Sequence, residues 1–233
     1  MLFKHISKFN NVNRRFLSII KFTNTNDQIV RCSDYSLSKI QQYFKYTQFS
    51  IHGYGRQGQA QALNLKDNGL NVLIGLRKGN SYDKAIKDGF IPNINLFSIE
   101  EATIKGDIIM NLLSNDGQKQ TWEKSVLPYL NKNKTLYFSH GFNIVYKNQT
   151  KIIPPSNIDV IMVAPKCSGK ILRSSFVKDY DINSNIAVYQ DYSGYAEQNA
   201  KYIGFAIGSK YLYRTTFENY VYNDIIKKRY ILM

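Results

Sequence analysis

A glycine-rich turn between two apolar runs constrains this chain more than any other feature. The stretch IHGYGRQGQAQALNLKDNGLNVLIGLRKG, residues 51–79, places Gly53, Gly55 and Gly58 at G-x-G-x-x-G spacing. In a strand–turn–helix unit the first glycine allows the tight turn, the second lets the backbone approach a pyrophosphate, and the third lets the helix pack against the strand. Backbone N–H groups and the positive end of the helix dipole then face the phosphates. The stretch predicts a dinucleotide-binding unit, with a glycine-rich turn without a ligand as the alternative.

The end of the second apolar run indicates which dinucleotide would bind. An acid at this position would bind a ribose 2′-hydroxyl and favour NAD. Arg77 and Lys78 stand there instead, with Ser81 close behind. Their side chains can make charge-assisted hydrogen bonds to a 2′-phosphate. We therefore expect NADP(H) rather than NAD(H), with a solvated basic turn as the alternative.

Short apolar runs alternate with amphipathic segments from Phe49 onward, an order typical of a parallel sheet with crossover helices. A Ser98/Glu101 capping box begins one short helix. Gly69 is placed to end the helix of the glycine unit. We predict an α/β fold over residues 49–233, a Rossmann-like, doubly wound, mostly parallel sheet with flanking helices. The expected strands are residues 48–52, 71–76, 107–113, 135–139, 159–163 and 185–189, and the other expected helices are 57–68, 117–130, 193–207 and 217–229.

The N-terminal segment differs in composition from the rest. The chain has a formal charge of +14, which favours anionic partners. Residues 1–48 hold eight Lys/Arg against two acids, and the first 26 residues hold no acid. Organelle transit peptides have this basic, acid-poor, amphipathic composition. We expect residues 1–48 to be a leader outside the fold that directs import into mitochondria, with plastids or a basic extension without import role as the alternatives.

Other features narrow the function classes. The two cysteines, Cys32 and Cys167, form neither a disulfide framework nor a metal-ligand pair. No run reaches the roughly 20 apolar residues needed to span a bilayer. The chain has no RNP, zinc-finger or KH pattern, so we expect no nucleic-acid partner, and a basic nucleic-acid-binding protein is only a third alternative.

Three motifs together resemble one family. GYGRQGQAQALNLKDNGLNVLIGLRKG, SHGFNIV and VIMVAPKCSG are similar to the N-terminal, NADP-binding domain of ketol-acid reductoisomerase, and the likeness runs from about Phe49 to Asp224. The resemblance implies the second common step of valine and isoleucine synthesis. In that step a magnesium-assisted alkyl shift in a 2-hydroxy-2-methyl-3-keto acid, such as 2-acetolactate, is followed by reduction by NADPH.

The resemblance also implies which residues contact the cofactor. The family commonly has a small residue where Arg56 stands. Its Leu-Pro-Asp loop has Ser114 and Asn115 here. Besides the three glycines, the implied contacts to NADP(H) are Tyr54, Arg56, Gln57, Arg77, Ser81, Asn115, Gln118 and Gly169.

His140 and Lys166 are the expected catalytic residues. Each follows an expected strand, where open α/β sheets form their crevice. A His can move protons at neutral pH, and a Lys can hold negative charge. Position alone leaves a strand-end residue with satisfied hydrogen bonds as the alternative, whereas the resemblance implies that both are catalytic. Cys167 has no evident activating group and is expected to be a small packed residue.

The metal site departs from the family pattern. The family holds two Mg²⁺ ions with carboxylates, two of which lie four residues apart on one helix face. The first matches Asp224, but the second position holds Lys228, which cannot bind magnesium. The family's all-helical C-terminal domain is absent from these 233 residues. We therefore expect weak or no turnover from this chain alone and leave open whether it is an enzyme.

Three interpretations of this pattern stay open. The chain is a truncated or mis-spliced product of an active enzyme gene, a degenerate relative that keeps NADPH binding, or a chain that needs a second polypeptide to supply the missing half. A homo-oligomer or such a complementing chain is the expected protein partner. A non-catalytic NADP-binding module and another NADP-linked dehydrogenase are the competing functions, because a fold alone does not fix chemistry.

Overall fold

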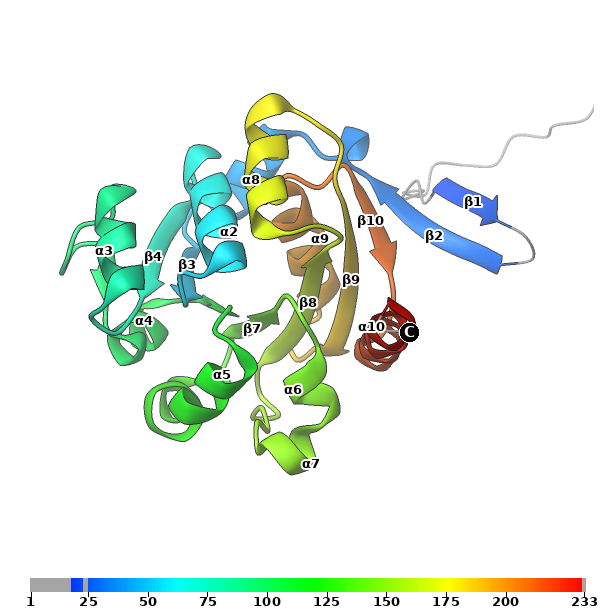
Figure 1. The fold of residues 1–233 in the computed structure, drawn as a ribbon. Coiled ribbons are helices and arrows are strands. Elements are labelled where there is room, and N and C mark those ends of the chain that lie inside the picture. The colour runs from blue at the N-terminus through cyan, green and yellow to red at the C-terminus, as the bar shows by residue number, and fades with distance from the viewer. Residues whose placement is uncertain (1–17, 23–24, 232–233) are drawn as a thin grey trace, which may run out of the picture.

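The computed structural model describes residues 18–22 and 25–231, which form one sheet with helices packed against it (Figure 1). The strands in the described part are β1 (Ser18–Phe22), β2 (Thr25–Arg31), β3 (Gln48–His52), β4 (Asn71–Gly75), β5 (Leu96–Phe97), β6 (Ile108–Asn111), β7 (Thr135–Phe138), β8 (Asp159–Pro165), β9 (Asn183–Gln190) and β10 (Tyr211–Arg214). The helices are α1 (Leu37–Tyr43), α2 (Arg56–Asp67), α3 (Asn80–Lys87), α4 (Ile99–Lys105), α5 (Asn115–Thr121), α6 (Phe142–Val145), α7 (Lys147–Thr150), α8 (Gly169–Lys178), α9 (Ala196–Ala206) and α10 (Phe217–Ile231).

The strand order confirms the predicted doubly wound sheet. The order is β1-β2-β10-β9-β8-β7-β6-β3-β4-β5. The strands from β5 to β8 are parallel to one another. From β3 the chain adds β4 and β5 on one side and then β6, β7 and β8 on the other, so the strand order reverses between β3 and β6. In such sheets ligands bind outside the carboxyl ends of the strands at this switch point. Beyond it, β9 runs antiparallel to β8, β10 runs parallel to β9, and β2 runs antiparallel to β10.

The central strands are apolar on both sides because both faces of the sheet are covered. On β8, Ile161 and Val163 belong to one buried cluster, which includes Phe49 and residues of α2 and α9. The alternate positions, Val160 and Met162, belong to a second cluster on the opposite face, around Trp122 and Phe138. The two clusters therefore cover the two faces of the sheet under the switch point.

Several local predictions agree with the structure. Gly69 has φ +72° and follows α2, as a left-handed C-terminal position requires. The Ser98/Glu101 capping box is formed at the start of α4. The expected helix over 117–130 is only partly right: α5 ends at Thr121, and the chain continues through a wider helical turn and a short 3-10 turn that contains Pro128. Pro cannot donate to the helical ladder, which accounts for the tighter end.

The expected boundary between leader and fold at residue 48 is wrong. Val30 pairs with Leu212 of β10, and both Ile29 and Val30 are only 2% exposed. Phe44, after α1, is 1% exposed and packs its ring edge-on against Phe49 of β3. An uncovered β10 would present unpaired backbone groups, and β2 satisfies them. The chain from residue 29 onward is therefore part of the domain. Residues 1–17 and 23–24 lie outside the described residues, so an import role for the acid-free segment stays a prediction.

Candidate functional site

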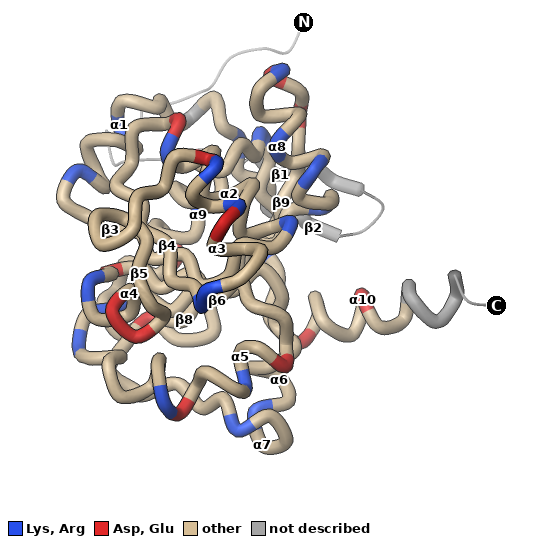
Figure 2. The backbone as a smooth tube through the Cα atoms, turned by 60° about the vertical axis from the view of Figure 1, so that its left-hand side comes forward, with Lys and Arg blue, Asp and Glu red and all other residues tan. Residues whose placement is uncertain are grey.

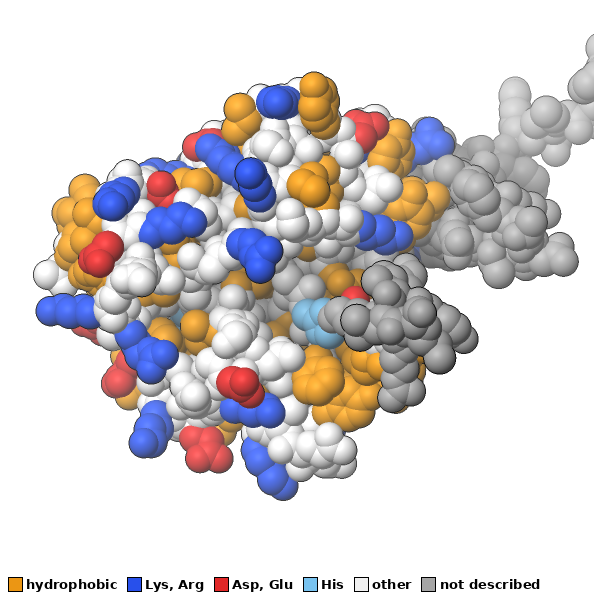
Figure 3. All heavy atoms as spheres, viewed as in Figure 1, with side chains coloured by type: hydrophobic (Ala, Val, Ile, Leu, Met, Phe, Trp, Pro, Cys, Tyr) orange, Lys and Arg blue, Asp and Glu red, His pale blue; other side chains and the backbone are white. Residues whose placement is uncertain are grey.

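The carboxyl ends of β3, β4 and β6 surround a cavity of about 670 Å³. Three segments line most of it: the glycine turn at residues 53–55, the loop at 76–81 after β4, and the loop at 112–114 after β6. This volume falls within the roughly 300–1,000 Å³ usual for ligand sites. The space-filling view shows Lys and Arg side chains spread over α3, α2 and α8 on the face drawn (Figure 3). Position, size and charge all suit a phosphorylated ligand.

The glycine turn fits a pyrophosphate because its three glycines differ in what surrounds them. A Cβ on Gly53, which has φ +92°, would lie 3.0 Å from the Leu112 carbonyl oxygen. A Cβ on Gly58 would lie 2.2 Å from the Gly53 carbonyl oxygen. A Cβ on Gly55 would meet nothing within 4 Å. Two glycines therefore make the turn compact, and the third leaves open space on the side that lines the cavity.

Gly169 supports this turn from behind. A Cβ there would lie 1.9 Å from the Arg56 carbonyl oxygen, so the first turns of α8 and α2 touch backbone to backbone. The Gln57 side chain donates to the Cys167 carbonyl oxygen over 2.9 Å and joins the same two segments. Gly169 and Gln57, both expected as cofactor contacts, thus set the position of the turn. Neither helix has an acid in its first turn, which keeps the field at these N-termini positive.

The loop after β4 brings positive charge to the cavity. Arg77, Lys78 and Ser81 are exposed, and all three line it. Gly79 has φ +140° and precedes α3, so the first turn of α3 also lies at the wall. A neighbouring hollow of about 410 Å³ shares Arg77 and Lys78 and adds apolar and aromatic walls from residues such as Phe97. Glu100 and Glu101 also line this hollow, and Arg77 and Lys78 are its only positive charges among the described lining residues.

Two expected cofactor contacts use their side chains elsewhere. Tyr54 is 2% exposed and its hydroxyl donates to Asp88 Oδ2 over 2.9 Å, so only its backbone is available at the turn. Burial, with Asp88 second, raises the pKa of this phenol. The Gln118 amide donates to the Asn111 and Leu113 carbonyl oxygens, at 3.2 and 3.0 Å. Gln118 therefore shapes the loop after β6 and does not line the cavity.

Asn115 and its neighbours complete that loop. Ser114 caps α5 by accepting from the Gly117 N–H, over 3.2 Å. Asn115 is exposed at the start of α5, and its carbonyl oxygen accepts from the Asn143 side chain, over 3.3 Å. Ser114 thus supplies the N-terminal cap of α5. Asn143 was not expected from the sequence, although it lies inside the SHGFN motif.

His140 lies at the carboxyl end of β7 and contacts Asp224. The Phe142 N–H donates to His140 Nδ1 over 3.2 Å, and His140 Nε2 lies 3.0 Å from Asp224 Oδ2. Because Nδ1 accepts, the neutral ring carries its proton on Nε2 and donates it to the carboxylate. Both side chains are about one-third exposed, at 34% and 30%. The pair can hold or exchange a proton at the edge of the sheet.

Gly141 makes this pair possible. A Cβ on Gly141 would lie 2.8 Å from the Phe217 ring and 3.3 Å from Val221, so α10 packs directly on the His140 turn. Phe217, Val221 and Asp224 lie one turn apart on a single helix face. Burial, with Asp224 second, raises the pKa of the adjacent Tyr220 to about 12. The helix α10 points away from the rest of the domain (Figure 2).

The other expected catalytic residue, Lys166, follows β8. Its Nζ lies 4.2 Å from the centre of the Tyr213 ring, a cation–π distance. Burial raises the pKa of the Cys167 thiol, which agrees with a packed residue. His52, which precedes the glycine turn, is fully buried, and burial lowers its pKa to about 3. The His52 ring is therefore neutral near pH 7.

The described residues do not make a magnesium site by themselves. They contain no group of three or more His, Cys, Asp or Glu side chains arranged to hold a metal ion. Asp224 is half of the expected carboxylate pair and is engaged with His140. Lys228 stands one turn later on α10, and its side chain lies outside the described residues. In the same part of the chain, no helix is long and apolar enough to cross a membrane.

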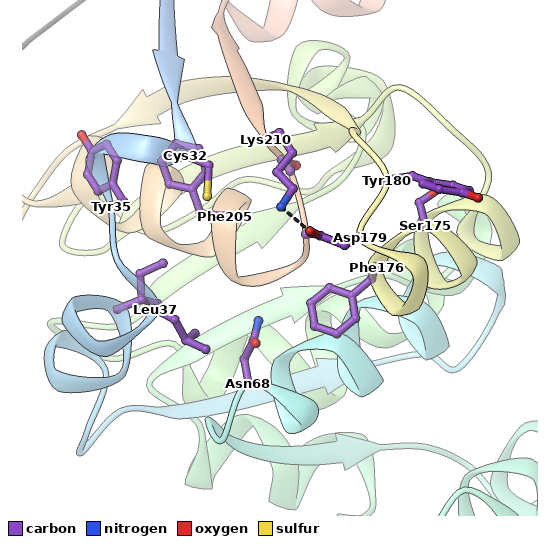
Figure 4. A pocket seen from close by; sticks show the side chains of 13 residues that line it. Cys32, Tyr35, Leu37, Asn68, Ser175, Phe176, Asp179, Tyr180, Phe205 and Lys210 are labelled. Carbon is purple, nitrogen blue, oxygen red and sulfur yellow. Dashed lines mark hydrogen bonds and ion pairs between the residues drawn. The ribbon is translucent and has the colours of Figure 1, made fainter.

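A second cavity, of about 300 Å³, lies elsewhere and suits an anion poorly (Figure 4). The helices α2, α8 and α9 end at it, and helix C-termini repel negative charge. Lys210 pairs with Asp179 inside it, at 2.5 Å. Cys32 and Leu37 form part of its wall, which again shows that this N-terminal segment belongs to the fold.

Comparison with known proteins identifies the family. A family described as acetohydroxy acid isomeroreductase, NADPH-binding domain, matches residues 43–212. A probable mitochondrial ketol-acid reductoisomerase from Schizosaccharomyces pombe is 47% identical over 94% of this chain and 54% of its own length. A ketol-acid reductoisomerase (NAD(+)) from Desulfosudis oleivorans is 50% identical over 92% of this chain and 61% of its own length. The chain thus spans little more than half the length of these relatives.

Solved structures agree with this match. An NADH-preferring ketol-acid reductoisomerase from an uncultured archean superposes with a TM-score of 0.76 at 36% identity, over 85% of this chain and 59% of the other. A 3-hydroxyisobutyrate dehydrogenase from Mycobacterium tuberculosis, at 14% identity and a TM-score of 0.55, shares the fold alone. The residues that match the family, 43–212, include the glycine turn and the strands of the parallel sheet. The chain therefore belongs to the ketol-acid reductoisomerase (acetohydroxy acid isomeroreductase) family and spans its NADPH-binding domain.

Proposed function

We propose that this chain binds NADPH for a ketol-acid reductoisomerase reaction of valine and isoleucine synthesis, with a 2-acetolactate-type 2-hydroxy-3-keto acid as the substrate. The observation that carries the proposal is the cavity at the switch point, where the open side of Gly55 and the Arg77/Lys78 loop face the same space. When bound, NADPH would supply the hydride that reduces the keto group.

The chain's own residues would divide the remaining work. The α2 N-terminus would hold the pyrophosphate, and Arg77, Lys78 and Ser81 would hold the 2′-phosphate. His140 would hold a proton on Nε2, next to Asp224 Oδ2. Lys166, at the end of the next parallel strand, would stabilise negative charge on a substrate oxygen. The family resemblance implies that the whole enzyme uses magnesium, and we keep this as part of the proposal. The described residues contain no cluster of metal-ligating side chains that would bind the ion by itself.

The preference for NADPH over NADH is the part of the proposal that the basic loop supports. Two relatives carry names that point to NAD or NADH, so the loop residues of this chain must decide. We expect NADPH to bind more tightly than NADH, and Arg77→Ala to weaken NADPH by about tenfold or more while changing NADH little. Isothermal titration calorimetry of both nucleotides measures this.

The matched control is Lys132→Ala, which removes an exposed charge next to the amino end of β7, away from the cavity. That variant should bind both nucleotides like the unaltered protein. Equal affinities for NADPH and NADH, or a preference that Arg77→Ala leaves unchanged, would contradict the assignment of the loop.

The activity of the 233-residue chain by itself is expected to be weak or absent. Lys228 adds a positive charge where the resemblance places a second magnesium ligand, and like charge repels a cation. Loss of one electrostatic contact of this kind typically costs on the order of 10²–10³ in rate. We expect little NADPH oxidation with 2-acetolactate and magnesium, and Lys228→Glu should restore some magnesium affinity without restoring turnover.

The assay follows NADPH absorbance with the purified chain. Robust turnover that His140→Ala abolishes would show that these residues suffice for catalysis. NADPH binding with no turnover under any condition, including addition of a separately supplied C-terminal domain, would favour the alternative of a non-catalytic NADP-binding module. Restored turnover on adding that domain would favour a chain that works with a complementing partner.

We also propose a mitochondrial location, with plastids as the alternative. Relatives from two yeasts carry mitochondrial names, and the first 26 residues of this chain hold no acid. Because β1 and β2 both belong to the sheet, we place the import signal within residues 1–17. A fluorescent reporter carrying residues 1–17 should reach mitochondria as well as one carrying residues 1–48, and a diffuse cytosolic signal from both would refute the location.

A further inference from the structure

Buried amide side chains hold both sides of the turn that carries His140. On one side is Ser139, at the end of β7. The Gln61 amide donates to Ser139 Oγ over 2.8 Å and to Gln57 Oε1 over 3.1 Å. Gln61 belongs to α2 and is fully buried, and its own oxygen accepts from the Tyr137 hydroxyl at 2.8 Å. The helix that begins at the glycine turn is therefore bonded to the residue before His140.

The second connection lies three residues after His140. The Asn143 amide donates to Gln118 Oε1 over 2.8 Å and to the Asn115 carbonyl oxygen over 3.3 Å. The Gln118 amide in turn holds the Asn111 and Leu113 carbonyl oxygens. Asn143 and Gln118 are 1% and 6% exposed. The loop after β6, which forms one wall of the cofactor cavity, is thus bonded to the start of α6.

Burying amides is unfavourable unless every group finds a partner. In the first connection both polar atoms of Gln61 are bonded, whereas in the second Asn143 Oδ1 has no hydrogen-bond partner among the described residues. Apolar side chains of similar size would fill the same space without that cost. What the amides provide is direction, because each bond fixes one cavity loop relative to the His140 turn.

We propose that Gln61 and Gln118 are positioning residues that couple the cofactor cavity to His140. The inference rests on the proposed NADPH site, because the coupling links the glycine helix and the loop after β6 to the proton-holding pair. When a dinucleotide fixes these two segments, the bonds to Ser139 and Asn143 fix the His140 turn as well. Neither glutamine contacts the reacting atoms in this account.

The test uses isosteric variants of the full chain and the His140 ring as the reporter. Gln61→Met and Gln118→Met remove the amide bonds and keep the volume. In these variants the Tyr137 hydroxyl still donates a hydrogen bond to the Val163 carbonyl oxygen, and the Asn143 amide still donates one to the Asn115 carbonyl oxygen. Both variants should therefore fold. The control is Gln190→Met, because the Gln190 amide also holds two carbonyl oxygens, those of Pro155 and Ile158, away from the cavity. His140→Gln assigns the NMR signal of the His140 ring.

In the unaltered protein, NADPH should shift the His140 ring resonances. Each methionine variant should reduce that shift, and the double variant should abolish it, with NADPH affinity lowered by about tenfold or less, the worth of a hydrogen bond. Gln190→Met should keep the full shift. A full shift in the folded double variant, or the same loss in Gln190→Met, would overturn the inference.

Failure of the proposed function gives a different pattern. If the unaltered protein does not bind NADPH, the proposed function is wrong, and the ligand-free spectra decide the coupling instead. The double variant should then still move the His140 ring and the Phe142 amide signals relative to the unaltered protein. Identical signals would show that the two glutamines do not position the His140 turn.

Discussion

Two close backbone contacts set the geometry of the glycine turn and of the cavity that it lines. Gly58 lies against the Gly53 carbonyl and Gly169 against the Arg56 carbonyl, each at a distance that no side chain could enter. These contacts bring the first turns of α2 and α8 together behind the turn. Of the three glycines in the turn, only Gly55 has open space where a Cβ would stand. Different glycines therefore make the compact side and the open side of the turn. The ligand-facing geometry therefore follows from packing that does not itself touch a ligand.

The same principle operates at the proton-holding pair. Gly141 lets α10 approach the His140 turn, and the helical repeat then carries Asp224 to within 3.0 Å of His140. The Phe142 N–H settles which ring nitrogen bears the proton. These contacts come from the end of β7, from α6 and from α10. His140 and Asp224 are not among the residues that line the cavity beside the Arg77 loop.

Local sequence signals predicted much of this structure. The β3–α2–β4 unit was predictable nearly to the residue, because an apolar strand, a glycine turn, an amphipathic helix and a capping glycine follow one another. His140 and Lys166 were correctly placed at strand ends, because their motifs follow apolar runs. The basic loop at residues 77–81 also follows an apolar run, and it lines the cavity at the end of that strand.

Features set by distant contacts could not be predicted in this way. The pairing of β2 with β10 joins segments about 180 residues apart in the sequence. The basic composition of residues 1–48 indicated a leader, so a strand was not expected there. Gln118 and Tyr54 were assigned to the cofactor, yet their side chains bond within the protein. Such hydrogen bonds depend on which loops meet in space. Asn143 gave a weaker signal, a polar residue in an otherwise apolar stretch, and its partners became clear only from the fold.

The glycine turn is expected to bind a dinucleotide pyrophosphate and not to be merely a tight turn. Gly55→Ala tests it most directly, because Gly55 has φ −74° and an added Cβ meets no protein atom within 4 Å. Measured by calorimetry and thermal unfolding, this variant should keep the melting temperature of the unaltered protein and lose most of its NADPH affinity. Gly58→Ala should instead lower the melting temperature, because its Cβ would meet the Gly53 carbonyl oxygen. Unchanged NADPH affinity in a stable Gly55→Ala protein would contradict the account.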